Sequence, residues 1–275
     1  SRSRGLGDVY KRQGVVDVCP FIPLRDVSME ACADMARTVV ARLAERGDIP
    51  LFLYGAAASC DERTVLSRLR KGEYEGLEAR LKGTDTVHDD DTRLPDAGAM
   101  AWTETVARSG GITVGARPIL VAYNVNVDEK DARVARKIGS IVRTSGRMLK
   151  SEQGGKIRSH GMLKGVQGMG VPVEELGISQ VSMNLLNVKD CPLHLAFKTC
   201  ESLAHDHETS LCGSEIVGLV PLQAMIAAGE FFAPEAEDER AKVAAAVKGL
   251  GLNHHHRFVP DEHIIEWALD REVIQ

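Results

Sequence analysis

The sequence of 275 residues is long enough to bury the core of one large domain or two small ones, and its 44% hydrophobic and 27% charged residues are typical of a globular protein. A net charge of −5 argues against a general binder of nucleic acid or of an anionic membrane. The sequence shows neither an apolar run as long as a membrane span nor a secretory signal, so we expect a cytoplasmic protein without a membrane partner. Six cysteines that lack Cys-x-x-Cys spacing fit reduced thiols in that compartment.

The first part of the chain predicts a leader followed by alternating strands and helices. Residues 1–13 have no helical or strand periodicity and resemble a translated cloning scar, so we interpret them as a non-native or disordered leader. A strand is predicted at residues 15–24, at a sheet edge, because Pro20 and Pro23 lack the N–H that a ladder requires. The next predicted elements are a helix, a short strand and a helix that is broken near Gly72, at residues 28–47, 49–54 and 61–81.

Residues 84–111 change character, because acidic residues, a proline and several glycines surround Trp102, and this pattern predicts a long loop. Loops of this length inside a compact domain are uncommon and are often functional. Asp89, Asp90 and Asp91 lie in it, but no neighbouring carboxylate or histidine at ligand spacing completes a set of metal ligands. We therefore interpret the three aspartates as a solvated acidic turn and predict no metal site.

The remainder of the chain predicts the order strand, helix, strand, strand, helix, strand and helix. This order is the split βαβ, or ferredoxin-like, pattern, in which helices cover one face of an antiparallel sheet and leave the other face free. The predicted elements lie at residues 119–127, 129–143, 163–171, 178–187, 192–208, 211–219 and 222–232. The connection at 143–164 is strongly basic, which favours either attraction of carboxylates or a flexible polar loop. A further helix is predicted at residues 235–252, and the three histidines just beyond it, His254 to His256, are interpreted as exposed turn residues.

Two of these predicted strands carry amide side chains on one face. With a period of two, valines and other apolar residues alternate with Asn124, Asn126, Gln180, Ser182 and Asn184. Asparagine is depleted in strands because its side chain competes for the backbone hydrogen bonds, so these amides indicate another role. Each amide offers both a donor and an acceptor, which suits a heterocycle or an amide-bearing substrate. The alternative is a solvated outer face, or amides that bridge neighbouring strands.

Seven short strings stand in order along the chain. They are Asp17-Val-Cys-Pro-Phe-Ile-Pro, Leu53-Tyr-Gly, Gly72-Glu-Tyr-Glu, Val114-Gly-Ala-Arg, Ala122-Tyr-Asn-Val-Asn, Gln180-Val-Ser-Met-Asn-Leu and Gly213-Ser-Glu-Ile-Val-Gly-Leu-Val-Pro. In their order and approximate spacing they resemble the glutamate formimidoyltransferase family, whose formiminotransferase domain is also found in formimidoyltransferase-cyclodeaminases. The resemblance runs from Gly14 to about Leu269.

The resemblance implies transfer of a formimidoyl group between N-formimidoyl-L-glutamate and tetrahydrofolate, the co-substrate, in histidine degradation and one-carbon metabolism. It also implies a homodimer and an α/β fold with two ferredoxin-like-type subdomains, whose sheets face a ligand tunnel. Residues 14–114 would form a partial N-terminal subdomain and residues 115–275 the C-terminal subdomain.

The resemblance further suggests where ligands and chemistry belong. The family's folate-binding segment is carried onto Gly98, Ala99, Met100, Ala101, Trp102, Ser109, Gly110 and Gly111. Arg117 is a candidate partner for a substrate carboxylate, although it could equally pair with an internal acid such as Glu215. The family's catalytic histidine falls at Tyr10, and the opening elements of the first subdomain are missing, so we expect this chain to be truncated and inactive or nearly so.

Two alternatives to this function stay open. Glutamate formyltransfer would use the same architecture, because the two groups differ only by =NH against =O. A non-catalytic module that binds folate or RNA is the other alternative. RNA binding predicts paired exposed aromatic residues on the central strands, whereas these strands carry amides.

Overall fold

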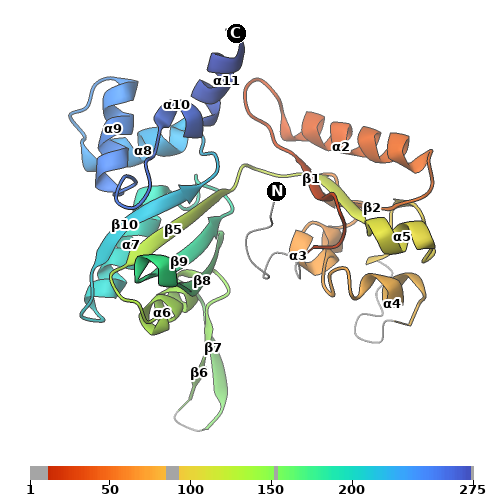
Figure 1. Ribbon diagram of the computed structural model, residues 1–275, viewed down its shortest axis with the longest axis horizontal. Helices are drawn as coiled ribbons and strands as arrows, with labels where there is room; N and C mark the ends of the chain where they lie inside the picture. The colour runs from red at the N-terminus through yellow and green to blue at the C-terminus, as the bar shows by residue number, and fades with distance from the viewer. Residues whose placement is uncertain (1–11, 85–92, 152–153, 274–275) are drawn as a thin grey trace. The chain divides into compact units, whose positions relative to one another are not determined.

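The computed structural model describes residues 12–84, 93–151 and 154–273, which fall into two compact units (Figure 1). Unit 1 is Ser1–Pro118 and unit 2 is Ile119–Gln275. Each unit contains its own four-stranded sheet and its own apolar core. Within the described ranges, no helix is both long enough and apolar enough to cross a membrane.

Some sequence predictions concern residues outside the described ranges. They include the acidic turn at Asp89 to Asp91, the position Tyr10 and most of the leader. Two residues assigned to the leader, Arg12 and Gln13, are described and belong to unit 1. Gln13 is fully buried, and its backbone N–H donates to Asp17 Oδ1 at 2.9 Å. The packed part of unit 1 therefore includes the last residues of the predicted leader.

The sheet of unit 1 has the order β1-β4-β2-β3. Its strands are β1 (Asp17–Phe21), β2 (Pro50–Gly55), β3 (Ala97–Gly98) and β4 (Ile112–Ala116). Strand β4 is parallel to both neighbours, and β3 is antiparallel to β2. Strand β1 is shorter than the predicted 15–24 and contains Pro20 but not Pro23. It lies at the sheet edge as predicted, where one row of N–H groups can stay unpaired.

Helices cover both faces of this sheet. Helix α2 (Met29–Ala44) begins after Ser28, whose hydroxyl accepts from the Ala31 N–H at 3.1 Å, and its apolar side packs on one face. The other face packs against three short helices, α3 (Leu66–Leu69), α4 (Leu77–Leu81) and α5 (Glu104–Ser109). Unit 1 therefore leaves no open sheet face among its described residues.

Two sequence predictions for unit 1 were wrong in detail. The break predicted near Gly72 is present, since Gly72 takes a φ of +92° between α3 and α4, but the first half of the helix predicted at 61–81 is itself divided into the 3-10 turn η1 (Asp61–Arg63) and α3. The loop predicted at 84–111 contains β3 and α5, and it leads into β4. Every residue of β4 is buried, so a strand that sequence reasoning missed is central to the sheet.

The sheet of unit 2 has the order β10-β5-β9-β8, and all its pairs are antiparallel. Its strands are β5 (Val121–Val127), β8 (Val166–Val173), β9 (Ile178–Leu185) and β10 (Leu211–Val217). Helices α6 (Arg133–Val142) and α7 (Leu193–His205) join them, and the turn η3 (Glu174–Leu176) precedes β9. The predicted element order is present, with ends that differ by a few residues.

Four helices complete unit 2. They are α8 (Leu222–Phe232), α9 (Glu239–Gly249), α10 (Pro260–His263) and α11 (Ile265–Val273). Helix α8 has the predicted bounds, and Pro221 occupies its N-cap, where a missing N–H costs nothing. Side chains of α8 and α9 extend the core that begins on the sheet.

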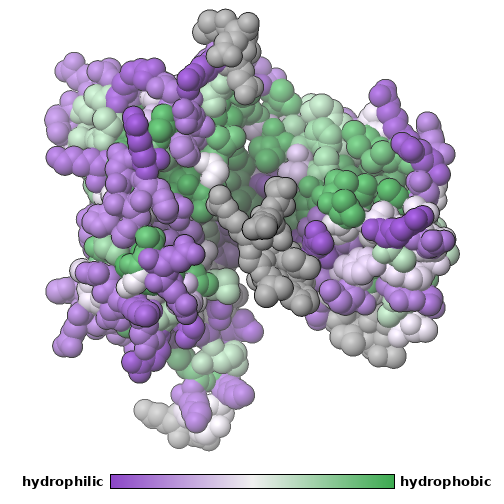
Figure 2. Space-filling model, in the orientation of Figure 1, coloured by the Kyte–Doolittle hydropathy of each residue, from purple (hydrophilic) through white to green (hydrophobic). Residues whose placement is uncertain are grey.

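The basic connection at 143–164, predicted as a loop, contains an antiparallel hairpin that Figure 1 shows projecting from unit 2. Its strands are β6 (Arg147–Lys150) and β7 (Lys156–Ser159). Arginine and lysine flank apolar residues in both strands, including the exposed Met148 and Ile157, and Figure 2 shows both kinds side by side on the projection. Gly154, which has a φ of +83°, lies between the two strands and allows the chain to turn there.

Helix α6 lies directly on strand β8 because glycines meet there. A Cβ on Gly170 would overlap the backbone of Ala135 and Arg136, and a Cβ on Gly139 would overlap the backbone at Met169. The apolar face of the sheet can therefore approach the helix closely, and buried residues such as Ile138 and Val142 fill the space around the contact.

We expect Gly170→Ala to lower the free energy of unfolding by about 1–3 kcal/mol, the usual cost of overpacking a close contact. Urea denaturation followed by circular dichroism measures the change. The control is Met169→Ala, on the neighbouring residue, whose side chain is 52% exposed and points to the other face. Equal denaturation midpoints for the two variants would contradict the close contact.

Candidate functional site

The five polar residues predicted to share a face do share one. The register of β5 and β9 pairs Asn124 with Ser182 and Asn126 with Gln180, while Asn184 pairs with Ala122. Directly paired residues of an antiparallel ladder project to the same side, and so do residues two apart on one strand. We call this surface the amide face.

The opposite side of the same strands is the core. Val121, Tyr123, Val125, Val181 and Met183 are buried there, and helices α6 and α7 contribute the side chains that pack on them. Tyr123 keeps its hydroxyl hydrogen-bonded to Ser214 Oγ at 3.0 Å. The core side therefore receives both helices, and the amide face points away from them.

Burial is uneven along the amide face. Asn126 and Gln180 are only 1% and 8% exposed, and the Gln180 Nε2 donates to Asn126 Oδ1 at 2.8 Å. This pair realises the alternative in which amides bridge neighbouring strands. Asn124, Ser182 and Asn184 are half-buried, and their side chains have no hydrogen-bond partner within the described part of the chain. These three are the members that are free to bind a ligand.

Strand β10 adds a carboxylate that the predicted face did not include. Its register places Glu215 opposite Asn124, and the Gln180 Nε2 lies 3.4 Å from Glu215 Oε2. The side chain of Glu215 is 32% exposed. Continuing the period-two alternation from β5 into strand 211–219 would have found it, but only with the strand order known.

The histidines that follow α9 lie against this carboxylate. His256 Nε2 is 4.0 Å from Glu215 Oε1, so the interpretation of these residues as simple exposed turn residues was wrong in part. His254 and His256 are exposed, but His255 is half-buried, and its Nε2 is buried without a partner among the described residues.

Glycines fix the histidine segment on strand β10. Ser214 N–H donates to the Gly251 carbonyl at 3.2 Å, which ties the chain after α9 to the strand. Gly213, with a φ of +96°, lets the segment approach, since a Cβ there would lie 2.6 Å from His254 Cβ. The sequence contains these glycines but does not reveal which strand they bring together.

The environment of His255 favours its neutral form. Burial lowers the pKa of His255 below its ordinary value of 6.5, and His254 and His256 act in the same direction, whereas a hydrogen bond with the Cys212 backbone and the charge of Glu215 oppose them. A neutral imidazole at this position leaves the Glu215 charge available to another cation.

Arg117, the predicted carboxylate partner, belongs to unit 1. Its Nη1 donates to the Pro118 carbonyl at 3.1 Å, and its guanidinium lies beside the Tyr54 phenol. Burial raises the pKa of Tyr54, and the adjacent Arg117 charge opposes that rise. Arg117 keeps N–H groups with which it could bind an anion.

The predicted folate-binding segment is divided by helix α5. Before the helix, Ala99 is buried, Met100 and Ala101 are exposed, and the Trp102 ring centroid lies 6.1 Å from that of Tyr74. Gly98 pairs with Pro50 in the sheet. Before the helix, the segment therefore contributes Gly98 to the sheet and Ala99 to the core of unit 1.

After α5, Gly110 and Gly111 approach the backbone of Gln13 and the ring of Phe52. Ser109 lines a cavity of about 280 Å³ together with Arg12, Tyr74 and Arg108. That cavity and Trp102 are the parts of the predicted segment that a ligand could contact.

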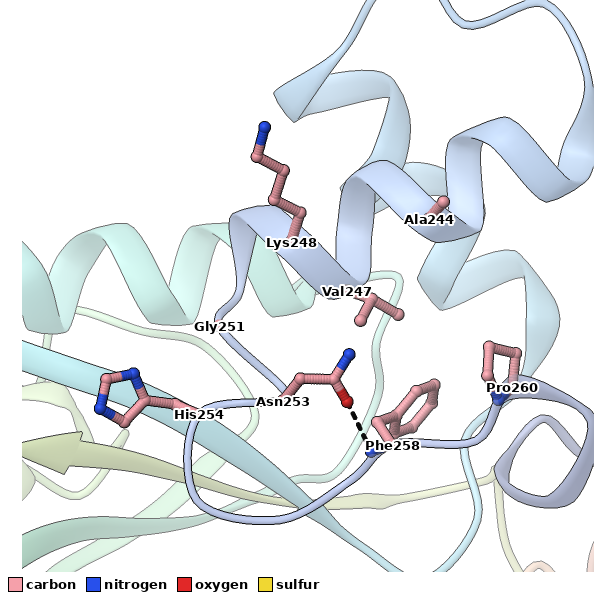
Figure 3. Close-up of a pocket in the computed structure, with 8 residues that line it drawn as sticks. All are labelled: Ala244, Val247, Lys248, Gly251, Asn253, His254, Phe258 and Pro260. Atoms are coloured by element: carbon pink, nitrogen blue, oxygen red, sulfur yellow. Dashed lines mark hydrogen bonds between the residues drawn. The ribbon is translucent and has the colours of Figure 1, made fainter.

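A second cavity, of about 610 Å³, lies in unit 2 between α9 and the segment that follows it (Figure 3). Val247 and Phe258 point toward one another there, while Lys248 points away. The Asn253 Oδ1 already accepts from the Phe258 N–H at 2.8 Å. None of the predicted binding residues lines this cavity.

Within the described ranges, no three histidine, cysteine or acidic side chains are grouped so that they could hold a metal ion. All six cysteines are free thiols. Burial raises the pKa of Cys200 to about 12, which keeps that thiol protonated at neutral pH.

We expect the His255 ring to titrate below 6.5 in an NMR pH titration, because burial disfavours its charged form. The unfolded chain then binds this proton more tightly than the folded one, so acidification through pH 6.5 should reduce the free energy of unfolding. His255→Gln should remove the low-titrating resonance, and His205→Gln should leave it in place. A midpoint at or above 6.5 would show that the ring is solvated.

In a comparison with known protein families, each unit matches a model of the same family. The model described as "Formiminotransferase domain" matches residues 122–270, and "Formiminotransferase domain, N-terminal subdomain" matches residues 8–117. The chain is 35% identical over 268 residues to a formimidoyltransferase-cyclodeaminase of Dictyostelium discoideum, covering 96% of this chain and 46% of that protein. A mouse protein of the same name is 37% identical over 267 residues, covering 94% and 45%.

A shorter relative matches as well. The glutamate formimidoyltransferase of Streptococcus pyogenes serotype M1 is 35% identical over 223 residues, which cover 81% of this chain and 67% of that protein. The chain spans about half the length of the cyclodeaminase-type relatives that it matches. The amide face lies within the region that the first family model matches.

Proposed function

This chain belongs to the formiminotransferase family, and we propose that its site is built for transfer of a formimidoyl group between N-formimidoyl-L-glutamate and tetrahydrofolate, although the position of the family's catalytic histidine holds Tyr10. The observation that carries the proposal is the amide face, where the side chains of Asn124, Ser182 and Asn184 have no hydrogen-bond partner among the described residues and lie on adjacent strands of unit 2. Tetrahydrofolate is the co-substrate in this proposal, and the protein acts as a homodimer.

The chemistry of the amide face suits a folate. The pterin ring presents donors and acceptors side by side, and the Asn184 carboxamide, one row away from Asn124 and Ser182, can supply the complementary acceptor and donor. Within unit 1, Trp102 and the cavity lined by Ser109 are the candidate folate contacts of the predicted segment.

Unit 2 also supports the ferredoxin-like description of the second subdomain. If its sheet strands are counted along the chain as first to fourth, the order across the sheet is fourth, first, third, second. Both connecting helices pack on the core side. In this arrangement the amide face forms one wall of the ligand site.

We expect Asn184→Leu to weaken tetrahydrofolate binding about tenfold, because a buried polar group of the ligand that loses its partner costs about 1–3 kcal/mol. Isothermal titration calorimetry of the chain with tetrahydrofolate measures the affinity. Gln223→Leu is the matched control, since it removes an exposed amide from α8. Unchanged affinity in Asn184→Leu would remove this residue from the site.

We expect the chain to transfer the formimidoyl group at or near the background rate, although it binds the folate. The position of the family's histidine holds Tyr10, and loss of a general acid–base group typically costs on the order of 10²- to 10⁴-fold in rate. A spectrophotometric assay of formimidoyl-tetrahydrofolate compares the chain with Tyr10→His, which should be faster. Appreciable transfer by the unchanged chain would contradict the assigned importance of this position.

A further inference from the structure

Glu215 is the one charged side chain that the described strand register assigns to the amide face. Across the sheet, Glu215 pairs with Asn124, Asn124 with Ser182, and Ser182 with Met169, and we call these four residues the Glu215 row. The neighbouring rows of the same face hold only amides or apolar residues. A partly buried carboxylate without compensating partners destabilises the folded protein, so a purely structural role does not explain a single acid among uncharged groups.

The partners that Glu215 has leave most of its capacity to accept hydrogen bonds unused. Gln180 Nε2 is 3.4 Å from Oε2 and makes its shorter bond, 2.8 Å, to Asn126. His256 Nε2 is 4.0 Å from Oε1. Charge-assisted N–H···O bonds are usually about 2.7–2.9 Å, so neither contact neutralises the carboxylate. Burial also lowers the pKa of His255, which keeps that neighbouring ring from supplying a positive charge.

The formimidoyl group of the donor is an amidine, and its protonated form is a planar cation with N–H groups on both nitrogens. A carboxylate binds such a fork through two parallel hydrogen bonds, as it binds the guanidinium of arginine. A formyl group has a carbonyl oxygen in place of one nitrogen and carries no charge. Beside a carboxylate, that oxygen meets another acceptor, so the same side chain attracts one donor and repels the other.

We propose that Glu215 pairs with the amidinium of the donor and thereby makes the site selective for formimidoylglutamate over formylglutamate. This inference rests on the proposed function and adds the residue that determines donor specificity. The row Glu215, Asn124, Ser182 crosses three adjacent strands over about 10 Å, the span of two interstrand spacings, which matches an extended glutamate derivative. Asn124 and Ser182 can donate to the donor's carboxylates away from the Glu215 charge.

The test is a binding measurement, so it does not depend on turnover. Isothermal titration calorimetry compares N-formimidoylglutamate with N-formylglutamate on the unchanged chain, on Glu215→Gln and on Glu201→Gln. Glu201 is an exposed glutamate on α7, on the core side of the sheet, and is the matched control. We expect the unchanged chain to prefer the formimidoyl compound. Glu215→Gln should weaken that compound tenfold or more and leave the formyl compound unchanged or tighter.

Glu215→Asp keeps the negative charge on a side chain that is one methylene shorter. It should therefore retain part of the preference for the formimidoyl compound. This second variant separates loss of the charge from disturbance of the strand, and thermal unfolding shows that each variant is folded. Equal weakening of both donors in Glu215→Gln, or no preference in the unchanged chain, would overturn the inference. If the unchanged chain still binds tetrahydrofolate, the proposed function survives that result. If it binds neither donor nor folate, both fail.

Discussion

The antiparallel pairing of β5 with β9 is the constraint on which unit 2 depends. Side chains alternate with a strict period of two, so the register that buries Tyr123 and Met183 also turns Asn124 and Ser182 outward. A slip by one residue would expose several buried apolar side chains, each worth about 1.5–3 kcal/mol. The hydrogen bonds of the amides are worth only about 0.5–1.5 kcal/mol each. Burial of the apolar side therefore decides the register, and the amide face follows from it.

That face combines a structural part with an open part. Toward one end, Gln180 joins β9 to Asn126 on β5 and approaches Glu215 on β10, so three strands share one polar connection. Asn124, Ser182 and Asn184 stay partly open. The bonded part holds the strands in place, and the open part can therefore meet a ligand without reorganising the sheet.

The sequence predicted the elements in which an apolar pattern repeats over several residues. It did not predict short elements or contacts between residues that are far apart in the chain. Helix α8 and the amide alternation of β5 and β9 were predicted because each repeats an apolar pattern over several residues. Strand β4 was missed because Ile112-Thr-Val-Gly-Ala is short and follows two glycines. The approach of His256 to Glu215 joins residues about 40 apart in the chain, and no local pattern encodes such a pairing.

The hairpin β6–β7 is closed at its base by main-chain bonds. Gly161 N–H donates to the Thr144 carbonyl at 3.3 Å, and Thr144 N–H donates to the Val166 carbonyl at 2.8 Å, while the hairpin strands pair only with each other. Its length is therefore uncoupled from the alignment of β8 in the main sheet. Insertions or deletions at its tip would alter how far this basic arm reaches while leaving the ligand-facing strands undisturbed, so reach can diverge between related proteins faster than the strands themselves.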